Sequence, residues 1–148
     1  MAKHIAERGL EREQAGQSLA ELSIVLVLFL VVTFGIVDAG RLILAYNAVS
    51  LSAREGVRYA IVRGSKSLTP ATQSDINAYV QSKTVGLPPV DVTVTWCTPA
   101  LTCSSSPTDY SDPGSSVEVT VHSIFTPVTP FLSRTINLTS TSKMLISR

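Results

Sequence analysis

The stretch QSLAELSIVLVLFLVVTFGIVDAGR, residues 17–41, contains sixteen consecutive residues without an ionisable side chain, Leu22 to Val37. As a helix, these residues would be roughly 24 Å long, whereas the hydrocarbon core of a bilayer is roughly 30 Å thick. A spanning helix must therefore also carry Leu19–Glu21 or Asp38–Ala45 into the membrane. A core helix of a soluble protein seldom lacks charge on every face over this length. The stretch predicts a transmembrane helix.

The composition excludes several other classes of protein. The chain has 148 residues, which is one modest domain, and only 16% of them are charged, against about 25% in ordinary globular proteins. A disordered chain would combine low hydrophobicity with a high net charge, but the net charge here is +1. The same value gives no electrostatic reason to expect a nucleic-acid partner. Two histidines and two cysteines are too few for a convincing metal site, so we expect no metal and no cofactor.

The helical pattern continues beyond the charge-free stretch. Apolar residues recur at three- and four-residue spacing over residues 42–60, and we expect one helix from about Ser18 to Arg63, which Gly35 and Gly40 could bend. A second stripe of small residues recurs every four positions, and such a stripe lets another backbone approach closely. Its members are Ala48, Ser52, Gly56 and Ala60.

The C-terminal part predicts a second helix followed by strands. Thr69 and Pro70 are typical of a helix start, and Gly86 is typical of its end. The apolar period then becomes two over residues 90–96 and 117–121, and a third strand is expected over 136–146. Short loops favour antiparallel pairing. The predicted fold is α+β: a long N-terminal transmembrane and protruding helix, a short second helix and a small three-stranded antiparallel sheet.

Cys97 and Cys103 flank a short turn-rich segment between the first two expected strands. In a reducing compartment the pair would indicate metal or redox chemistry, although a CxxC motif is absent, and in an oxidising one it would indicate a disulfide. If the domain is exported, we predict a structural disulfide that stabilises the fold by about 2 kcal/mol.

The junction before the apolar stretch carries a recognisable spacing. Gly16 is followed five residues later by Glu21, at the start of the apolar helix, which resembles the processing site of type IV prepilins. The resemblance implies that a prepilin peptidase removes residues 1–16, a cytoplasmic leader peptide, by cutting between Gly16 and Gln17. A carboxylate at the membrane edge needs a partner, and the amino terminus of a neighbouring subunit would be the partner of Glu21. Ser18 and Glu21 also fit a capping box, and the two interpretations are compatible.

Residues 14–63 more specifically resemble the TadE-like family of pseudopilins from the tight-adherence (Tad, Flp) pilus systems. The resemblance depends on Glu21, GIVDAGR at 35–41, Tyr46 and AREGVRYA at 53–60. It implies a membrane-anchored minor pseudopilin or pilus assembly protein with one span in the inner (cytoplasmic) membrane. The expected partners are the prepilin peptidase, other pseudopilins, the pilus assembly machinery and membrane lipid.

The resemblance also implies a division of the chain after the leader. Residues 17–64 would form the transmembrane and assembly helix, whose small-residue stripe packs against other pseudopilins. Residues 65–148 would form an extracytoplasmic α+β domain. Lys and Arg flank the apolar stretch on both sides, so the positive-inside rule does not decide the orientation, which depends on the cysteines and on the resemblance.

Charged residues after the apolar stretch have two interpretations each. Asp38 and Arg41 are three residues apart and can pair on one helix face. The pair either sets the register against another subunit or marks where the helix leaves the lipid. Arg54, Arg58 and Arg63 either contact headgroups or an acidic partner, or form a solvated helix face.

Two other classes of function are considered. Small residues around Ala39 fit a conventional signal peptide cleaved after that residue, which would release a secreted binding domain. A hydrolase would use His122, with Glu118 on the same face of the strand. The sequence contains no Gly-rich phosphate loop and no nucleophile elbow, so we expect no enzymatic activity.

Overall fold

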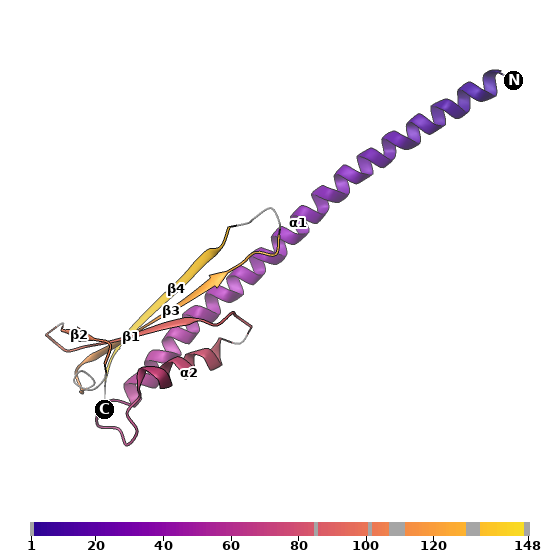
Figure 1. Ribbon diagram of the computed structural model, residues 1–148. Helices are drawn as coiled ribbons and strands as arrows, with labels where there is room; N and C mark the ends of the chain where they lie inside the picture. The colour runs from indigo at the N-terminus through magenta and orange to yellow at the C-terminus, as the bar shows by residue number, and fades with distance from the viewer. Residues whose placement is uncertain (1, 85, 101, 107–111, 130–133, 147–148) are drawn as a thin grey trace.

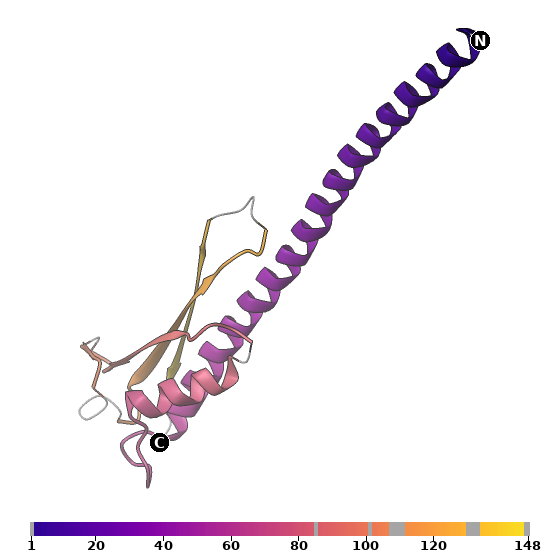
Figure 2. The same ribbon diagram turned by 45° about the vertical axis from the view of Figure 1, so that its right-hand side comes forward.

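A long helix carries a small α+β domain on its C-terminal half (Figures 1 and 2). The computed structural model describes residues 2–84, 86–100, 102–106, 112–129 and 134–146, with side chains described from residue 16 onward. The elements in chain order are α1 (Ala2–Val62), α2 (Gln73–Lys83), β1 (Asp91–Cys97), β2 (Cys103–Ser104), β3 (Ser116–Phe125) and β4 (Ile136–Leu145).

Helix α1 is continuous through both the expected leader and the expected transmembrane stretch. It has 61 residues, which corresponds to roughly 92 Å at 1.5 Å per residue. The first proline of the chain is Pro70, so no ring interrupts the ladder of backbone hydrogen bonds before that point. The helix also continues through Gly35 and Gly40, where a bend had been considered.

Helix α2 begins three residues later than the expected Thr69–Pro70 start. Thr72 is its N-cap: the hydroxyl accepts a hydrogen bond from the backbone N–H of Asp75, and the Asp75 carboxylate accepts one from the backbone N–H of Thr72. This reciprocal capping box satisfies the backbone N–H groups of both Thr72 and Asp75, and it fixes the helix start at Thr72. The hydrogen bonds from Thr72 hold the pKa of Asp75 below its ordinary value.

The sheet has four antiparallel strands in the order β2-β1-β3-β4, so the prediction of three strands was wrong. The additional strand, β2, has two residues, and Cys103 pairs with Cys97 directly across the ladder. Such a strand is too short to show an alternation of its own. The expected disulfide joins the same two residues, and it links β2 to the end of β1. The α+β class, the long and short helices and the antiparallel pairing were predicted correctly.

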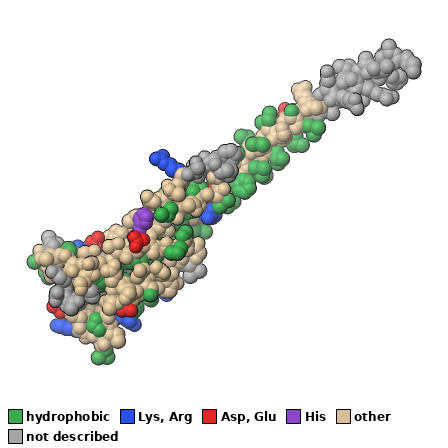
Figure 3. Space-filling view, in the orientation of Figure 1, with side chains coloured by type: hydrophobic (Ala, Val, Ile, Leu, Met, Phe, Trp, Pro, Cys, Tyr) green, Lys and Arg blue, Asp and Glu red, His purple; other side chains and the backbone are tan. Residues whose placement is uncertain are grey.

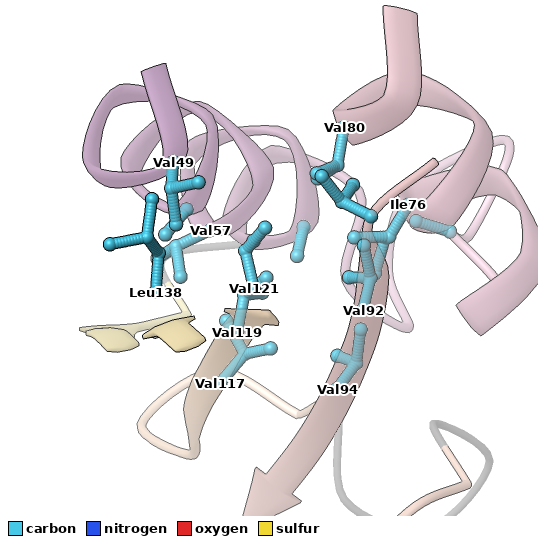
Figure 4. Packing of buried hydrophobic residues seen from close by; sticks show 14 of the residues in the cluster. Val49, Val57, Ile76, Val80, Val92, Val94, Val117, Val119, Val121 and Leu138 are labelled. Atoms are coloured by element: carbon cyan, nitrogen blue, oxygen red, sulfur yellow. The ribbon is translucent and has the colours of Figure 1, made fainter. Parts of the chain in front are cut away.

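The core lies between one face of the sheet and the two helices (Figure 4). Strands β1 and β3 alternate buried and exposed positions, and the buried ones are mostly valines. On α1 the buried positions fall at helical spacing, at Val49, Ala53 and Val57, and on α2 they are Ile76 and Val80. The helices cover one face of the sheet. The alternate residues of the strands, many of them threonines, lie on the other face.

At Gly56, α1 lies close to both α2 and β3. A Cβ added there would lie 2.7 Å from Val80 Cγ2 and 3.2 Å from Val119 Cγ1. Valine side chains have few alternative rotamers, so neither neighbour can move away easily. Any side chain at this position must push α2 or β3 outward.

Gly56→Ala is predicted to lower the thermal stability of the purified full chain in detergent. Overpacking costs about 1–3 kcal/mol, whereas the gain in helix propensity is at most about 1 kcal/mol. Gly40→Ala is the matched control, because nothing lies within 4 Å of an added Cβ at Gly40 and only the propensity gain applies. Circular dichroism melts measure both; equal rises in melting temperature for the two variants would contradict the packing described for Gly56.

Candidate functional site

The first half of α1 presents an uncovered apolar surface. From Gly16 to Val37 every described side chain is exposed except Gly35, which is half-buried. Figure 3 shows hydrophobic side chains around this part of the helix, beyond the α+β domain. The segment Gly16–Val62 is long and apolar enough to cross a membrane, and none of its most apolar 18-residue window is buried. An apolar surface of this size needs lipid or a protein partner to cover it.

Two hydroxyl groups within this stretch, those of Ser23 and Thr33, are satisfied by backbone carbonyls of the same helix. The Ser23 hydroxyl donates to the Ala20 carbonyl at 2.7 Å, and the Thr33 hydroxyl donates to the Phe29 carbonyl at 2.8 Å. Both hydroxyls are therefore hydrogen-bonded when the helix lies in the hydrocarbon core of a bilayer, where no water is available as a partner. The stretch is consistent with a single-pass membrane protein.

Asp38 is the first buried residue along the described side chains of α1, and it is 5% exposed. Its carboxylate accepts hydrogen bonds from the loop that follows β3: from the Val128 N–H at 3.0 and 3.1 Å, and from the Thr129 N–H at 2.9 Å. The Thr129 hydroxyl donates a further bond of 2.7 Å. One carboxylate on the helix thus satisfies three donors of a loop that lies 90 residues away in the sequence.

Arg41 completes this junction. Its Nη1 lies 3.1 Å from Asp38 Oδ1, and its guanidinium lies 5.4 Å from the centre of the Phe125 ring, at the end of β3. The pairing of Asp38 with Arg41 had been expected from their spacing. The contacts with the loop had not, because nothing in the local sequence of either segment relates them. The structure thus adds an intramolecular function to the pair: it joins the end of the sheet to the point where the apolar helix becomes covered.

The residues of the expected processing site lie on the continuous helix. Gly16, Gln17 and Glu21 are all exposed, and nothing lies within 4 Å of a Cβ added at Gly16. Because α1 begins at Ala2, Ser18 does not lie at a helix start, so the capping-box interpretation does not apply in this structure. The side chains of the expected leader before Gly16 lie outside the described residues.

The small-residue stripe lies mostly inside the domain. Ser52, Gly56 and Ala60 are buried and Ala48 is half-buried. The Ser52 hydroxyl donates to the Val49 carbonyl at 2.9 Å, within the helix. The stripe therefore permits close packing of α1 within this chain, and its three buried members present no surface to a second subunit.

Of the three arginines Arg54, Arg58 and Arg63, two have contacts within the chain. Arg58 lies 3.8 Å from the Glu55 carboxylate, and Arg54 is exposed. Arg63 donates to the Tyr59 hydroxyl at 2.6 Å and lies 4.4 Å above the Tyr59 ring. That ring stacks on Tyr79 of α2, with centroids 4.4 Å apart, so Arg63 belongs to the contact between the two helices.

The remaining candidates do not assemble into a chemical site. His122 and Glu118 lie half-buried on the face of the sheet opposite the helices. Within the described parts of the chain, no three His, Cys, Asp or Glu side chains lie together in a way that would hold a metal ion. The disulfide between Cys97 and Cys103 is the expected one, and it is confirmed.

Comparison with known families identifies the long helix. Residues 16–58 match the family model described as TadE-like protein. These residues form a TadE-like segment. The resemblance inferred from the sequence is confirmed over this part of the chain. The TadE-like segment begins at Gly16 and ends within α1, and together with the uncovered apolar helix it fits a membrane protein related to Tad pili. Searches of curated proteins and of solved structures found no match.

Asp38→Asn is predicted to free the end of the sheet from the TadE-like helix. An amide in place of the carboxylate keeps one acceptor oxygen and directs N–H groups at donors, so the Val128 and Thr129 amides lose partners. Hydrogen exchange of these two amides should become faster, whereas that of central β3 amides stays the same. Asp91→Asn, an exposed acid on β1, is the control. Unchanged exchange at Val128 and Thr129 would show that Asp38 does not hold the loop.

Proposed function

We propose that the chain is a minor pseudopilin or pilus assembly protein of a Tad/Flp-type pilus system, anchored in the inner membrane and acting by helix packing without a reaction of its own. One observation carries the proposal: the helix that matches the TadE-like family is uncovered over Gly16–Val37 and is also the core of the C-terminal domain. Packing of the exposed half against a partner would therefore act on the sheet through one continuous helix. The proposed partners are other pseudopilins and the assembly machinery.

The first part of the proposal is processing by a prepilin peptidase between Gly16 and Gln17. A peptidase needs an extended backbone, so the helix must open locally, and glycine is among the residues that stabilise a helix least. Cleavage would leave a positive amino terminus at the N-terminal end of a helix, where the helix dipole disfavours positive charge. Glu21 lies one turn further along, and its carboxylate would offset this charge on the same chain or on a neighbour.

The secreted-domain alternative has less support. Cleavage after Ala39 would cut α1 within a continuous helix and would separate Asp38 from Val128 and Thr129, to which it is bonded. The released domain would lose the junction that fixes the end of its sheet. Identification of the mature amino terminus separates the two hypotheses directly.

We predict that the chain, expressed with its prepilin peptidase and extracted from membranes, begins at Gln17 by intact-mass spectrometry. Gly16→Leu should leave most of the protein at full length, because a bulky side chain replaces the residue that allows the helix to open. Gly9→Leu, a matched change at another glycine of the leader, should not alter processing. An amino terminus at Met1 in the presence of active peptidase would contradict the pilin-like function. One at Gly40 would instead favour the signal-peptide hypothesis.

The second part of the proposal places the C-terminal domain outside the cytoplasm, and the disulfide supports it, since structural disulfides persist in oxidising compartments. We predict that neither Cys97 nor Cys103 reacts with N-ethylmaleimide added to intact cells before lysis, and that both react after reduction. Cys97→Ser is the control, because its single remaining thiol should react without reduction. Labelling of both cysteines in the unreduced wild type would place the domain in the cytoplasm.

A further inference from the structure

The charge-free stretch of α1 is shorter than the membrane it would cross. Its sixteen residues, Leu22 to Val37, span roughly 24 Å of helix, which leaves roughly 6 Å of a hydrocarbon core of roughly 30 Å uncovered. About four further residues of α1 must therefore lie in the hydrocarbon at one end of the stretch or the other. Local sequence leaves both ends open, at Leu19–Glu21 and at Asp38–Ala45, but their surroundings in the fold differ.

The two carboxylates that limit the stretch are not equally satisfied. Glu21 is exposed, and it has no hydrogen-bond or ion-pair partner among the described residues. Asp38 is buried, and its oxygens accept hydrogen bonds from Val128, Thr129 and Arg41. An ionised carboxylate is costly in hydrocarbon unless it is paired and hydrogen-bonded. Extension of the hydrocarbon past Asp38 is therefore much less costly than extension past Glu21.

The connection that follows β3 lies beside this end of the stretch. Side chains of a helix point toward its N-terminus, so the Asp38 carboxylate lies on the membrane side of its own Cα, together with the Val128 and Thr129 N–H groups bonded to it. In Figures 1 and 2 the end of β3 points toward the uncovered half of α1. Both N–H groups have acceptors, as backbone at the edge of the hydrocarbon requires.

Apolar side chains are uncovered at this height. Val128 is 64% exposed, although its backbone N–H is held by Asp38. Ile136 is 39% exposed and pairs with Phe125, whose ring lies 5.4 Å from the Arg41 guanidinium. Exposed apolar side chains that continue an apolar transmembrane surface are suited to contact with lipid.

The charges at this end of the domain fit a membrane surface. Among the described residues 34–45, 124–129 and 134–137 the only carboxylate is Asp38, which is buried. The same residues include two cations, Arg41, whose side chain is 45% exposed, and Arg134, which is exposed. Arginine lays its apolar stem along apolar surface while its guanidinium reaches phosphate oxygens. The exposed charge at this end is therefore positive, and it complements an anionic leaflet.

We propose that the connection after β3, at residues 126–129, is a second membrane contact. The leaflet on the side of the sheet domain covers the Val128 side chain, and the hydrocarbon ends between Asp38 and Arg41. Arg41 and Arg134 then lie at the level of the lipid phosphates. This contact sets the depth at which α1 is inserted and holds the sheet next to the membrane. It rests on the membrane anchoring in the proposed function, but not on processing or on the pilus.

The test is nitroxide labelling of single introduced cysteines in the full-length, uncleaved chain, in nanodiscs of phosphatidylglycerol and phosphatidylcholine. Cys97 and Cys103 form a disulfide, so the introduced thiol alone reacts. The ratio of collision rates with oxygen and with a nickel chelate is high in hydrocarbon, because oxygen is apolar and the chelate is hydrated. Val128→Cys should give a ratio severalfold above that of Leu68→Cys. Leu68 is the matched control, a fully exposed apolar residue beyond the far end of α1.

A second pair of labels tests the boundary on the helix itself and does not depend on the loop. Ala20 and Ala39 are exposed alanines that lie two residues before and two residues after the charge-free stretch. Ala39→Cys should give a ratio severalfold above that of Ala20→Cys. Equal ratios, or the reverse order, would overturn the proposal, because the hydrocarbon would then extend at least as far past Glu21.

Ile36→Cys, within the stretch, separates failure of this inference from failure of the anchoring. A high ratio at residue 36 combined with the Leu68 value at residue 128 would overturn the loop contact alone. The Leu68 value at both positions would overturn the anchoring as well. Shielding of residue 128 from both reagents that disappears at one copy per nanodisc would assign Val128 to a second copy, and this would also overturn the proposal.

Discussion

The Asp38 carboxylate determines where the membrane-facing half of the long helix ends and the folded domain begins. A carboxylate next to sixteen charge-free residues is unfavourable unless its oxygens accept hydrogen bonds. Val128, Thr129 and Arg41 together supply the donors. Two of these residues belong to the connection between β3 and β4. The hydrogen bonds that stabilise the carboxylate near the membrane therefore also fix the end of the sheet.

A single helix meets two different surroundings along its length, and its sequence reflects both. From Leu22 to Val37 no side chain is ionisable and every residue except Gly35 is exposed, as suits lipid or neighbouring helices. Beyond this stretch, large apolar side chains and small residues share one face, and Gly56 permits the contact with Val80 and Val119. Helix α1 is continuous across the two halves, and no proline interrupts it, because the first proline of the chain is Pro70. A force or a contact on the exposed half therefore reaches the sheet through a continuous helix, which is the physical basis of the proposed assembly function.

Much of the fold followed from local patterns in the sequence. The charge-free stretch, the change of apolar period from helical to two, and the Cys97–Cys103 pair each depend on neighbouring residues, and each led to a correct element or bond. The first helix was expected from about Ser18, whereas α1 begins at Ala2. Two further local predictions failed for identifiable reasons. Strand β2 has two residues, which is too short to show an alternation of apolar and polar side chains. The start of α2 depends on whether the hydroxyl of Thr72 or that of Thr69 accepts a hydrogen bond from a backbone N–H of the first turn. The processing residues Gly16, Gln17 and Glu21 follow from spacing alone, and the fold adds only that they are exposed on a helix.

Local sequence patterns account for the long apolar helix, its TadE-like character and the α+β class, because hydrophobic periodicity and spacing are properties of nearby residues. Which surfaces remain open depends instead on the packing of distant segments. Ser52, Gly56 and Ala60 looked like an interface for another subunit, yet the protein's own α2 and sheet cover them. Asp38 looked like the partner of Arg41 alone, yet most of its hydrogen bonds come from a loop 90 residues away. Burial and long-range pairing depend on how distant segments pack together, which no local pattern specifies, and so the junction at Asp38 forms only once the sheet lies against the helix.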